Sequence, residues 1–273
     1  MMRALWTGAS GMTAQQMQLD SIGNNLANVN TTGFKRENIE FKSLLYQTMR
    51  RTDLDPANQT GRPVNLQVGL GVRAAATARD FTNGNIQVTN MHMDFALAGD
   101  GFFVVSRGLD AGVGFTRDGS FKISYGPDGS MISTSDGLPV LSTDGEPIVL
   151  PPEVSPSNLL INRFGNVEYQ DPELGTVDLG IQIAIVQFGN PQGLEAIGGN
   201  LFVQTAASGE PLSEADGMTN TRTEIIQGAL ERSNVQVAIE MVNMIVTQRA
   251  YELNARVITT SDEMLQQAAN LKR

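Results

Sequence analysis

The sequence contains no cysteine, a single histidine and a single tryptophan. Without cysteine, the chain forms neither a disulfide nor a thiolate metal site. With His92 as the only histidine, a cluster of histidine metal ligands is excluded, and a Ser-His-Asp triad would have to use His92 itself, whose neighbours Met91 and Met93 favour a structural role. We therefore expect His92 to be structural, and the composition favours neither a metal nor another cofactor.

Long apolar runs are also missing. The first 20 residues contain Arg3 and several Gly and Gln residues in place of the apolar run of about 7 to 15 residues that a secretory signal peptide carries. No window reaches the roughly 18 consecutive apolar residues that a transmembrane helix requires. We expect no cleaved signal peptide and no membrane insertion.

Positive charge is scarce after the first 51 residues. Residues 1–51 carry six Lys or Arg against three acidic residues, whereas the remainder carries 13 basic and 26 acidic residues. Nucleic acids and anionic membrane surfaces attract clustered Lys and Arg, so the acidic remainder argues against both as partners.

An apolar repeat is present at the N-terminal end. Its members recur every seven residues: Leu5, Met12, Leu19 and Leu26, with Ile22 beside them. This spacing places one stripe along a helix of about 25 residues. The stripe stops before Asn30 to Gly33, where side-chain hydrogen bonds and a permissive glycine end helices.

A second apolar stripe occupies the C-terminal end, at spacings near 3.5 residues. Its members are Val237, Met241, Met244, Tyr251, Ala255, Ile258, Leu265 and Ala269. Ser233 and Asn234 precede it and supply N-cap chemistry. Two one-sided stripes must be buried against each other or against neighbouring subunits, so we expect these helices to be marginal in the monomer and stable in an assembly.

The middle of the chain, residues 80–230, has a different character. Short β-prone runs are Phe102 to Val105, Phe121 to Ser124, Leu159 to Asn162, Val177 to Phe188 and Leu201 to Thr205. Asp-Gly dipeptides begin at residues 100, 118, 128, 136 and 144. Asp-Gly is favoured in type I′ hairpin turns, so we predict a mostly antiparallel β body with such turns.

Residues 34–79 connect the first helix to this body. From 46 to 72 they have neither helical nor strand period, and the stretch includes Pro56, Gly61 and Pro63. We read about 46–64 as an extended arm. The predicted class is α+β: terminal helices at 1–33 and 231–273, paired as a coiled-coil-like bundle, with the arm and the β body inserted between them.

Motifs for chemistry are weak. Residues 69–74, GLGVRA, match a dinucleotide fingerprint by letters, but no amphipathic helix follows them. The Asp-Gly carboxylates are explained by turns. The remaining alternative of a different class, a secreted β-rich carbohydrate-active enzyme, needs two carboxylates about 5 to 10 Å apart in a cleft. The sequence shows no Trp or Tyr cluster to hold a sugar, and we assign no catalytic, cofactor-binding or metal-binding residue.

Three segments resemble a known family. The stretch NNLANVNTTGFKR at 24–36, after LWTGASGMTAQQ at 5–16, resembles the amino-terminal signature of bacterial flagellar axial proteins, which build the rod and the hook. The stretch at 231–265 resembles their carboxy-terminal signature, and FTRDGSF at 115–121 resembles a motif of their body. LLYQTMR at 44–50, followed by the arm to about Val64, resembles a rod member of the family more than the hook protein.

The resemblance implies a non-enzymatic subunit that is exported unfolded through the flagellar type III apparatus and polymerises into a hollow tube crossing the periplasm. Its implied partners are further copies of itself, other rod proteins and the hook protein along the axis, the surrounding ring proteins, and the export apparatus. The tube would transmit torque, and the arm would stiffen it. The nearest alternative is another rod or hook subunit, which differs in whether residues 46–64 pack on adjacent subunits.

The resemblance also implies roles for individual residues. Helix or subunit packing is expected for Leu5, Met12, Leu19, Ile22, Leu26, Val237, Met241, Met244, Ile245, Tyr251, Ile258 and Leu265. Capping, turning or bridging is expected for the signature residues Asn24, Asn25, Asn28, Gly33, Phe34, Asn234 and Asn243. Tyr46, Pro56, Gly61 and Pro63 belong to the arm.

Overall fold

The computed structural model describes residues 2–50, 64–108, 112–126, 129–151, 158–171, 175–215, 217 and 221–270. The chain divides into two compact units. The first contains residues 1–26, 37–78 and 236–273, and the second contains residues 27–36 and 79–235. Each unit is described by itself.

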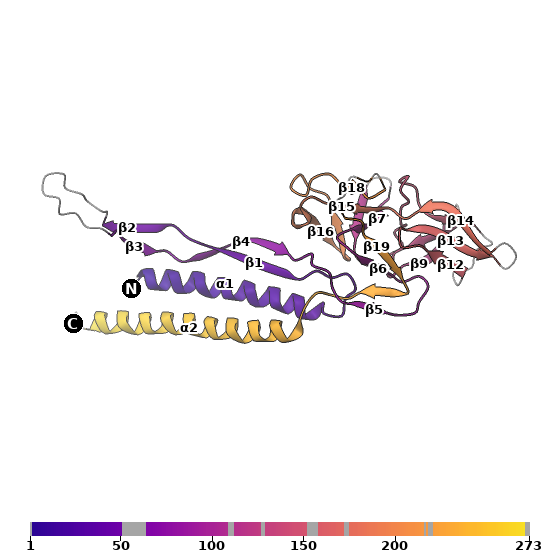
Figure 1. Cartoon of the computed structure of the whole chain (residues 1–273). Coiled ribbons are helices and arrows are strands. Elements are labelled where there is room, and N and C mark those ends of the chain that lie inside the picture. Colours follow the sequence, from indigo (N-terminus) through magenta and orange to yellow (C-terminus); the bar gives the residue numbers. More distant parts are fainter. Residues whose placement is uncertain are drawn as a thin grey trace, which may run out of the picture. The chain divides into compact units, whose positions relative to one another are not determined.

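The first unit is built on the two terminal helices, α1 (Met2–Ala27) and α2 (Val237–Asn270), which run side by side in opposite directions (Figure 1). Two glycines of α1 bring them together. A Cβ atom added at Gly8 would lie 3.0 Å from Cγ1 of Ile258, and one added at Gly11 would lie 2.8 Å from Nδ2 of Asn254. Because both glycines lack a Cβ, α2 approaches α1 closely along this stretch.

Two strand pairs complete the first unit. Strand β1 (Glu37–Ser43) pairs with β4 (Val72–Arg79), and β2 (Tyr46–Arg50) pairs antiparallel with β3 (Leu66–Gly69). The sequence analysis expected no paired strands in this connecting region. Residues 69–74, the weak dinucleotide match, join the end of β3 to β4, and no helix follows them.

The second unit contains the β body. Its largest sheet has the order β16 (Glu195–Gly198), β17 (Leu201–Val203), β8 (Val113–Thr116), β7 (Phe102–Ser106), β15 (Ile185–Gln187) and β18 (Leu212–Ser213). Two three-stranded sheets are β11 (Val149–Leu150), β10 (Gly129–Ser133), β9 (Lys122–Gly126), and β12 (Leu159–Ile161), β13 (Asn166–Asp171), β14 (Gly175–Gln182). Two pairs are β19 (Glu224–Gln227) with β6 (Phe95–Ala98), and β20 (Ala229–Glu231) with β5 (Ile86–Val88).

All neighbouring strands of these body sheets run antiparallel. The predicted α+β class, with a helix at each end and a mostly antiparallel β body between them, is therefore confirmed.

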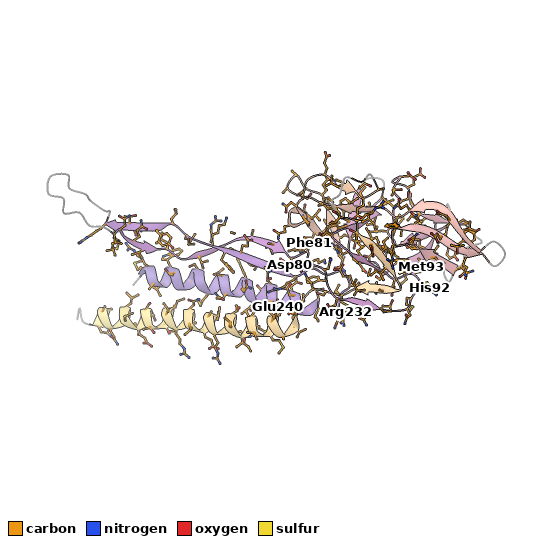
Figure 2. The ribbon with its side chains drawn as sticks, viewed as in Figure 1. Asp80, Phe81, His92, Met93, Arg232 and Glu240 are labelled. Carbon is orange, nitrogen blue, oxygen red and sulfur yellow. The ribbon has the colours of Figure 1, made fainter. Side chains whose placement is uncertain are left out.

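Two adjacent phenylalanines of β7 organise the core of the body. Successive side chains of a strand point to opposite faces, so Phe102 and Phe103 enter different apolar clusters. Phe103 packs edge-to-face on Phe121 at 5.0 Å between ring centroids, and Phe102 packs likewise on Phe188 at 5.7 Å. Met93, in the loop before β6, is half-buried and packs on the Phe103 cluster. The neighbouring His92 is exposed, and its carbonyl accepts a hydrogen bond from Gln227 (Figure 2).

One predicted strand is divided in the structure. The run from Val177 to Phe188 forms two strands, β14 and β15, which belong to different sheets. The break falls at Ile183 and Ala184, whose amides donate to the carbonyls of Gly165 and Leu141, on two different segments. Apolar residues recur along the whole run on both sides of the break, so the sequence pattern alone does not reveal the change of sheet.

The predicted type I′ turns at Asp-Gly are wrong for the dipeptides that the structure describes. Asp136 and Asp144 have negative φ, whereas a type I′ turn needs positive φ at both central residues. These two turns place only Gly137 and Gly145 in the left-handed region, at φ 82° and 80°. The dipeptides at 100 and 118 do not join paired strands, and the one at 128 includes a residue outside the described part of the chain.

Gly33 closes the turn that follows α1. Its φ is 66°, and an added Cβ would lie 2.7 Å from the carbonyl carbon of Arg117 and from the amide nitrogen of Asp118. Both the backbone conformation and the lack of space therefore require glycine at this position.

Ser233 and Asn234 do not cap α2, contrary to the prediction. The helix begins at Val237, and its first turn is marked by the amide of Glu240, which donates to the carbonyl of Gln236 at 3.0 Å. The Ser233 hydroxyl accepts from the amide of Val235, and Asn234 binds segments distant in sequence. Both side chains thus have hydrogen-bond partners before the helix starts.

Neither of the two long helices has a stretch apolar enough to cross a membrane.

We expect Gly33→Ala to lower the free energy of unfolding of the full chain by at least about 1 kcal/mol, because the new methyl group meets fixed backbone and the positive φ becomes strained. Chemical denaturation followed by circular dichroism measures this change. The matched control is Gly23→Ala in α1, where an added Cβ meets nothing within 4 Å. Equal loss of stability in both variants would contradict the assignment.

Candidate assembly site

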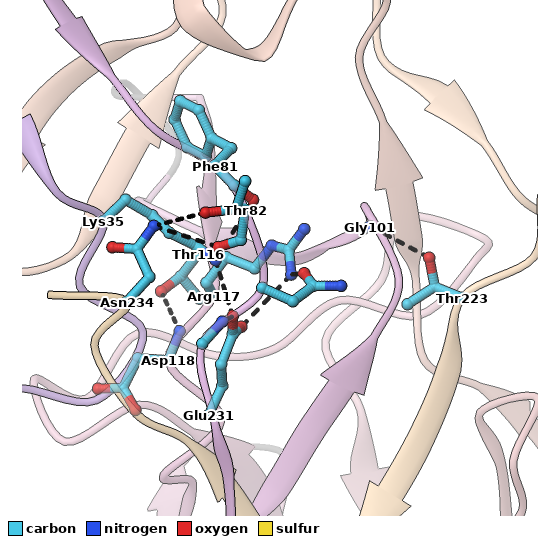
Figure 3. A network of polar contacts seen from close by, with 12 residues as sticks. Lys35, Phe81, Thr82, Gly101, Thr116, Arg117, Asp118, Thr223, Glu231 and Asn234 are labelled. Atoms are coloured by element: carbon cyan, nitrogen blue, oxygen red, sulfur yellow. Dashed lines mark hydrogen bonds and ion pairs between the residues drawn. The ribbon is translucent and has the colours of Figure 1, made fainter. Parts of the chain in front are cut away.

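The three sequence motifs meet at one buried ion cluster in the second unit (Figure 3). Lys35 comes from the first motif, Arg117 from the body motif and Glu231 from the third. Lys35 Nζ lies 2.7 Å from Oε1 of Glu231, and Arg117 Nη1 lies 3.3 Å from Oε2. Each side chain is 1% exposed, so residues up to 196 positions apart in the chain share a site closed to solvent.

The segment 81–84 closes the cluster from another side. Lys35 Nζ donates to the carbonyl of Thr82 at 2.8 Å, and Arg117 Nη1 donates to Oδ1 of Asn83 at 3.0 Å. The amide of Gly84 donates to Oε1 of Glu231 at 2.8 Å. The Arg117 guanidinium also lies over the ring of Phe102, 5.0 Å from its centroid, which joins the cluster to the apolar core.

The electrostatics of the cluster are governed by its burial. Burial lowers the pKa of Lys35 from its ordinary value, and the positive charge of Arg117 lowers it further, while Glu231 opposes both effects. Burial also lowers the pKa of Arg117, against the attraction of Glu231. Glu231 makes the ion pair with each of the two buried cations, so its removal leaves both without that contact.

Two signature asparagines, one in each unit, form hydrogen bonds with the backbone of other segments. Oδ1 of Asn234 accepts from the amide of Arg36 at 2.8 Å, and its Nδ2 donates to the carbonyl of Asp80 at 2.8 Å. In the first unit, Asn25 binds the backbone of Glu37 at both its amide and its carbonyl, at 2.9 and 2.8 Å. Each carboxamide thus binds both a backbone amide and a backbone carbonyl.

The other signature residues have local surroundings. The side chain of Asn28 accepts from the Thr31 hydroxyl in the turn after α1, and the amide of Phe34 donates to the carbonyl of Thr31. Asn24 is exposed on α1, and Asn243 is half-buried on α2.

The face of α2 that packs on α1 contains two heptad rows. The predicted apolar row consists of Val237, Met244, Tyr251, Ile258 and Leu265. A polar row that the sequence analysis missed lies beside it: Glu240, Thr247, Asn254 and Ser261. Glu240 is 1% exposed, Thr247 6% and Ser261 2%, whereas Val237 is 40% exposed and Tyr251 39%. The polar row is therefore the more deeply buried of the two.

The predicted packing residues are not all brought together. On α1, Ile22 is buried and Leu5, Met12, Leu19 and Leu26 are half-buried. On α2, Met241 and Ile245 are 52% and 57% exposed and lie outside both heptad rows. Tyr46 is exposed at the start of β2, and Pro56, Gly61 and Pro63 lie outside the described residues.

A further apolar face of α2 was missed by the sequence analysis. It consists of Ile239, Val242, Val246, Leu253, Val257 and Met264, each between 46% and 62% exposed. At 100° per residue these positions form one stripe beside the face that packs on α1. The signal was present in their spacings of three, four and seven residues. It is an unusually long apolar face for a helix to leave uncovered.

Three family models match: Flagella basal body rod protein at residues 5–35, Flagellar hook protein FlgE/F/G D1 domain at 96–169, and Flagellar basal body rod FlgEFG protein C-terminal at 226–271. Lys35, Arg117 and Glu231 fall one in each of these regions.

Curated relatives match over the whole chain. The flagellar basal-body rod protein FlgG of Borreliella burgdorferi is 48% identical over 100% of both chains. The protein of the same name from Bacillus subtilis is 38% identical over 100% of both chains, and that of Caulobacter vibrioides is 38% identical over 99% of this chain and 100% of its own.

We expect Glu231→Gln to lower the free energy of unfolding by about 3 kcal/mol or more, because two cations remain buried without their carboxylate. Urea unfolding of the full chain measures the loss. The matched control is Glu252→Gln, which breaks an exposed pair with Arg249 at 2.8 Å and should change stability by less than about 1 kcal/mol. A similar small change in both variants would show that the cluster does not hold the unit together.

Proposed function

The chain belongs to the FlgG family of flagellar basal-body rod proteins, and from this premise we propose how it acts as a structural subunit of the distal rod of the bacterial flagellum. The observation that supports the mode of assembly is the uncovered apolar face of α2, from Ile239 to Met264. The relatives are named flagellar basal-body rod proteins, and the chain is accordingly a structural subunit and not an enzyme.

We propose that this face is covered by other copies of the same chain. Each of these six side chains is about half exposed, so covering it is worth about half of the roughly 1.5 to 3 kcal/mol of a fully exposed one, about 5 to 9 kcal/mol in total before the entropy of association is subtracted. An isolated helix pair with polar residues in its seam gains little free energy from burying apolar side chains between its own helices. Polymerisation therefore supplies the stabilisation that the terminal helices lack.

The predicted packing residues are divided between two roles in this proposal. Residues near the α1 contact, such as Ile22 and Ile258, hold the helices of one chain together. Exposed residues outside both heptad rows, such as Met241 and Ile245, pack on neighbouring copies. The paired helices would line a hollow tube that serves as an export conduit, and the β body would lie outside them.

The remaining partners follow from this arrangement. Other rod proteins and the hook protein would continue the polymer along its axis. The surrounding ring proteins would face the β body where the rod crosses the periplasm, and the export apparatus would deliver the unfolded chain. Because torque loads all subunit contacts in parallel, many small interfaces can transmit it together.

We expect Leu253→Glu to abolish or strongly reduce formation of large particles by the full chain, because a charge enters the apolar face without a partner. Sedimentation velocity measures assembly, and circular dichroism checks that the β body still folds. The control is Gln248→Glu, which adds the same charge at an exposed polar position of α2. Assembly of both variants at the wild-type level would refute this face as a subunit contact.

The arm is a separate part of the proposal. Strands β2 and β3 form a two-stranded ribbon, and Tyr46, Met49 and Leu66 of this ribbon are all more than half exposed. A ribbon of two strands is marginal in water by itself. We propose that the arm, about residues 46–64, packs on adjacent subunits and stiffens the rod.

Deletion of residues 46–64 should leave polymerisation possible and yield a more bendable tube, because the contacts of the terminal helices remain while those of the arm are lost. Persistence length measured on electron micrographs of the polymers provides the readout. An unchanged persistence length would remove stiffening as the role of the arm.

A further inference from the structure

The seam between α1 and α2 poses a problem of register. The apolar residues Leu5, Met12, Leu19 and Leu26 of α1 recur every seven positions, as do Met244, Ile258 and the rest of the apolar row of α2. Sliding one helix by seven residues, about 10.5 Å, therefore superposes apolar positions again. Apolar contacts alone do not distinguish the native pairing from the shifted ones.

One contact is not repeated along the seam. The side chain of Asn254 occupies the space above Gly11, where an added Cβ would lie 2.8 Å from Nδ2 and 3.0 Å from Cγ of the asparagine. In the two shifted pairings Asn254 would face Ala4 or Gln18, which both carry a Cβ. Gly11 would then face Thr247 or Ser261, whose shorter side chains leave its space unfilled.

Gly8 makes the neighbouring close contact of the seam. Gly8 admits Ile258, whose Cγ1 would lie 3.0 Å from an added Cβ. A slide by seven residues places Tyr251 or Leu265 against Gly8 instead. Polar residues within an otherwise apolar helix seam are a known means of fixing register, at some cost in stability.

We propose that Asn254, seated against Gly11, is the specificity-determining residue that fixes the register of α2 on α1. The proposal concerns contacts within one chain. It therefore stands apart from the subunit contacts of the proposed function, and each can fail without the other.

Disulfide reporters test the register, since the chain has no native cysteine to interfere. Gly8→Cys with Ile258→Cys reports the native pairing, because a Cβ at position 8 would lie 3.0 Å from Cγ1 of Ile258, the site that the cysteine sulfur would take, so the two cysteines are within reach of a disulfide. Gly8→Cys with Tyr251→Cys, and Gly8→Cys with Leu265→Cys, report the shifted pairings. Non-reducing gels separate links within a chain from links between copies, which double the mass.

In the otherwise wild-type chain, we expect only the Ile258→Cys reporter to link within a chain. Asn254→Leu should let a shifted reporter link to an extent comparable with the native one, because the unique contact is replaced by one more apolar residue. Gly11→Ala, which keeps Asn254 and fills its space, should weaken the native link. Resistance of residues 79–235 to limited proteolysis checks that the second unit remains folded in every variant.

The control is Arg249→Leu, which makes the same kind of change at a position 74% exposed and should leave the link at Ile258→Cys alone. Three results would overturn the proposal. These are links confined to the native reporter in both test variants, shifted links in the Arg249→Leu control, and the absence of any link within the otherwise wild-type chain. All reporters are measured on the full-length chain, both before and after it forms large particles, so a defect in polymerisation is scored separately.

Discussion

The buried carboxylate of Glu231 is the constraint on which the second unit depends. It stands between Lys35 and Arg117, and every charge of the three is 1% exposed. Charges removed from water are costly unless they are paired, so alternative arrangements that separate these residues are strongly disfavoured. The cluster therefore selects one arrangement of three distant segments. Lys35 follows the turn after α1, Arg117 directly follows β8, and Glu231 is the last residue of β20.

Close backbone approach is the second condition for that cluster. Gly33 passes the backbone of Arg117, and Gly84 passes the carbonyl of Arg232, each at a distance that leaves no room for a Cβ. Asn234 then forms hydrogen bonds with both backbone segments, to the amide of Arg36 and to the carbonyl of Asp80. Glycine leaves room for the neighbouring backbone, and asparagine forms hydrogen bonds with its polar groups. These two needs explain why the motifs contain glycine and asparagine as well as charged residues.

The two units use apolar residues in opposite ways. In the body, phenylalanines of β7 and its neighbours are fully enclosed, and the fold is complete within one chain. In the helix pair, the inward face of α2 buries Glu240, Thr247 and Ser261, while Val246 and Leu253 remain more than half exposed. A helix that buries polar groups and exposes apolar ones is suited to partners outside its own chain. This contrast fits a folded body that is carried by helices completed on assembly.

The sequence by itself determined the helices at both ends, the β body between them and the three motifs, because heptad spacing, β-prone runs and short signatures are local properties. It did not reveal that Lys35, Arg117 and Glu231 meet, since contacts across 114 and 196 residues leave no local pattern. The division of the run from Val177 to Phe188 between two sheets also depended on which distant strands were available. Only the tertiary structure decided that α2 turns its polar row inward, because the glycines of α1 shape the surface that receives it.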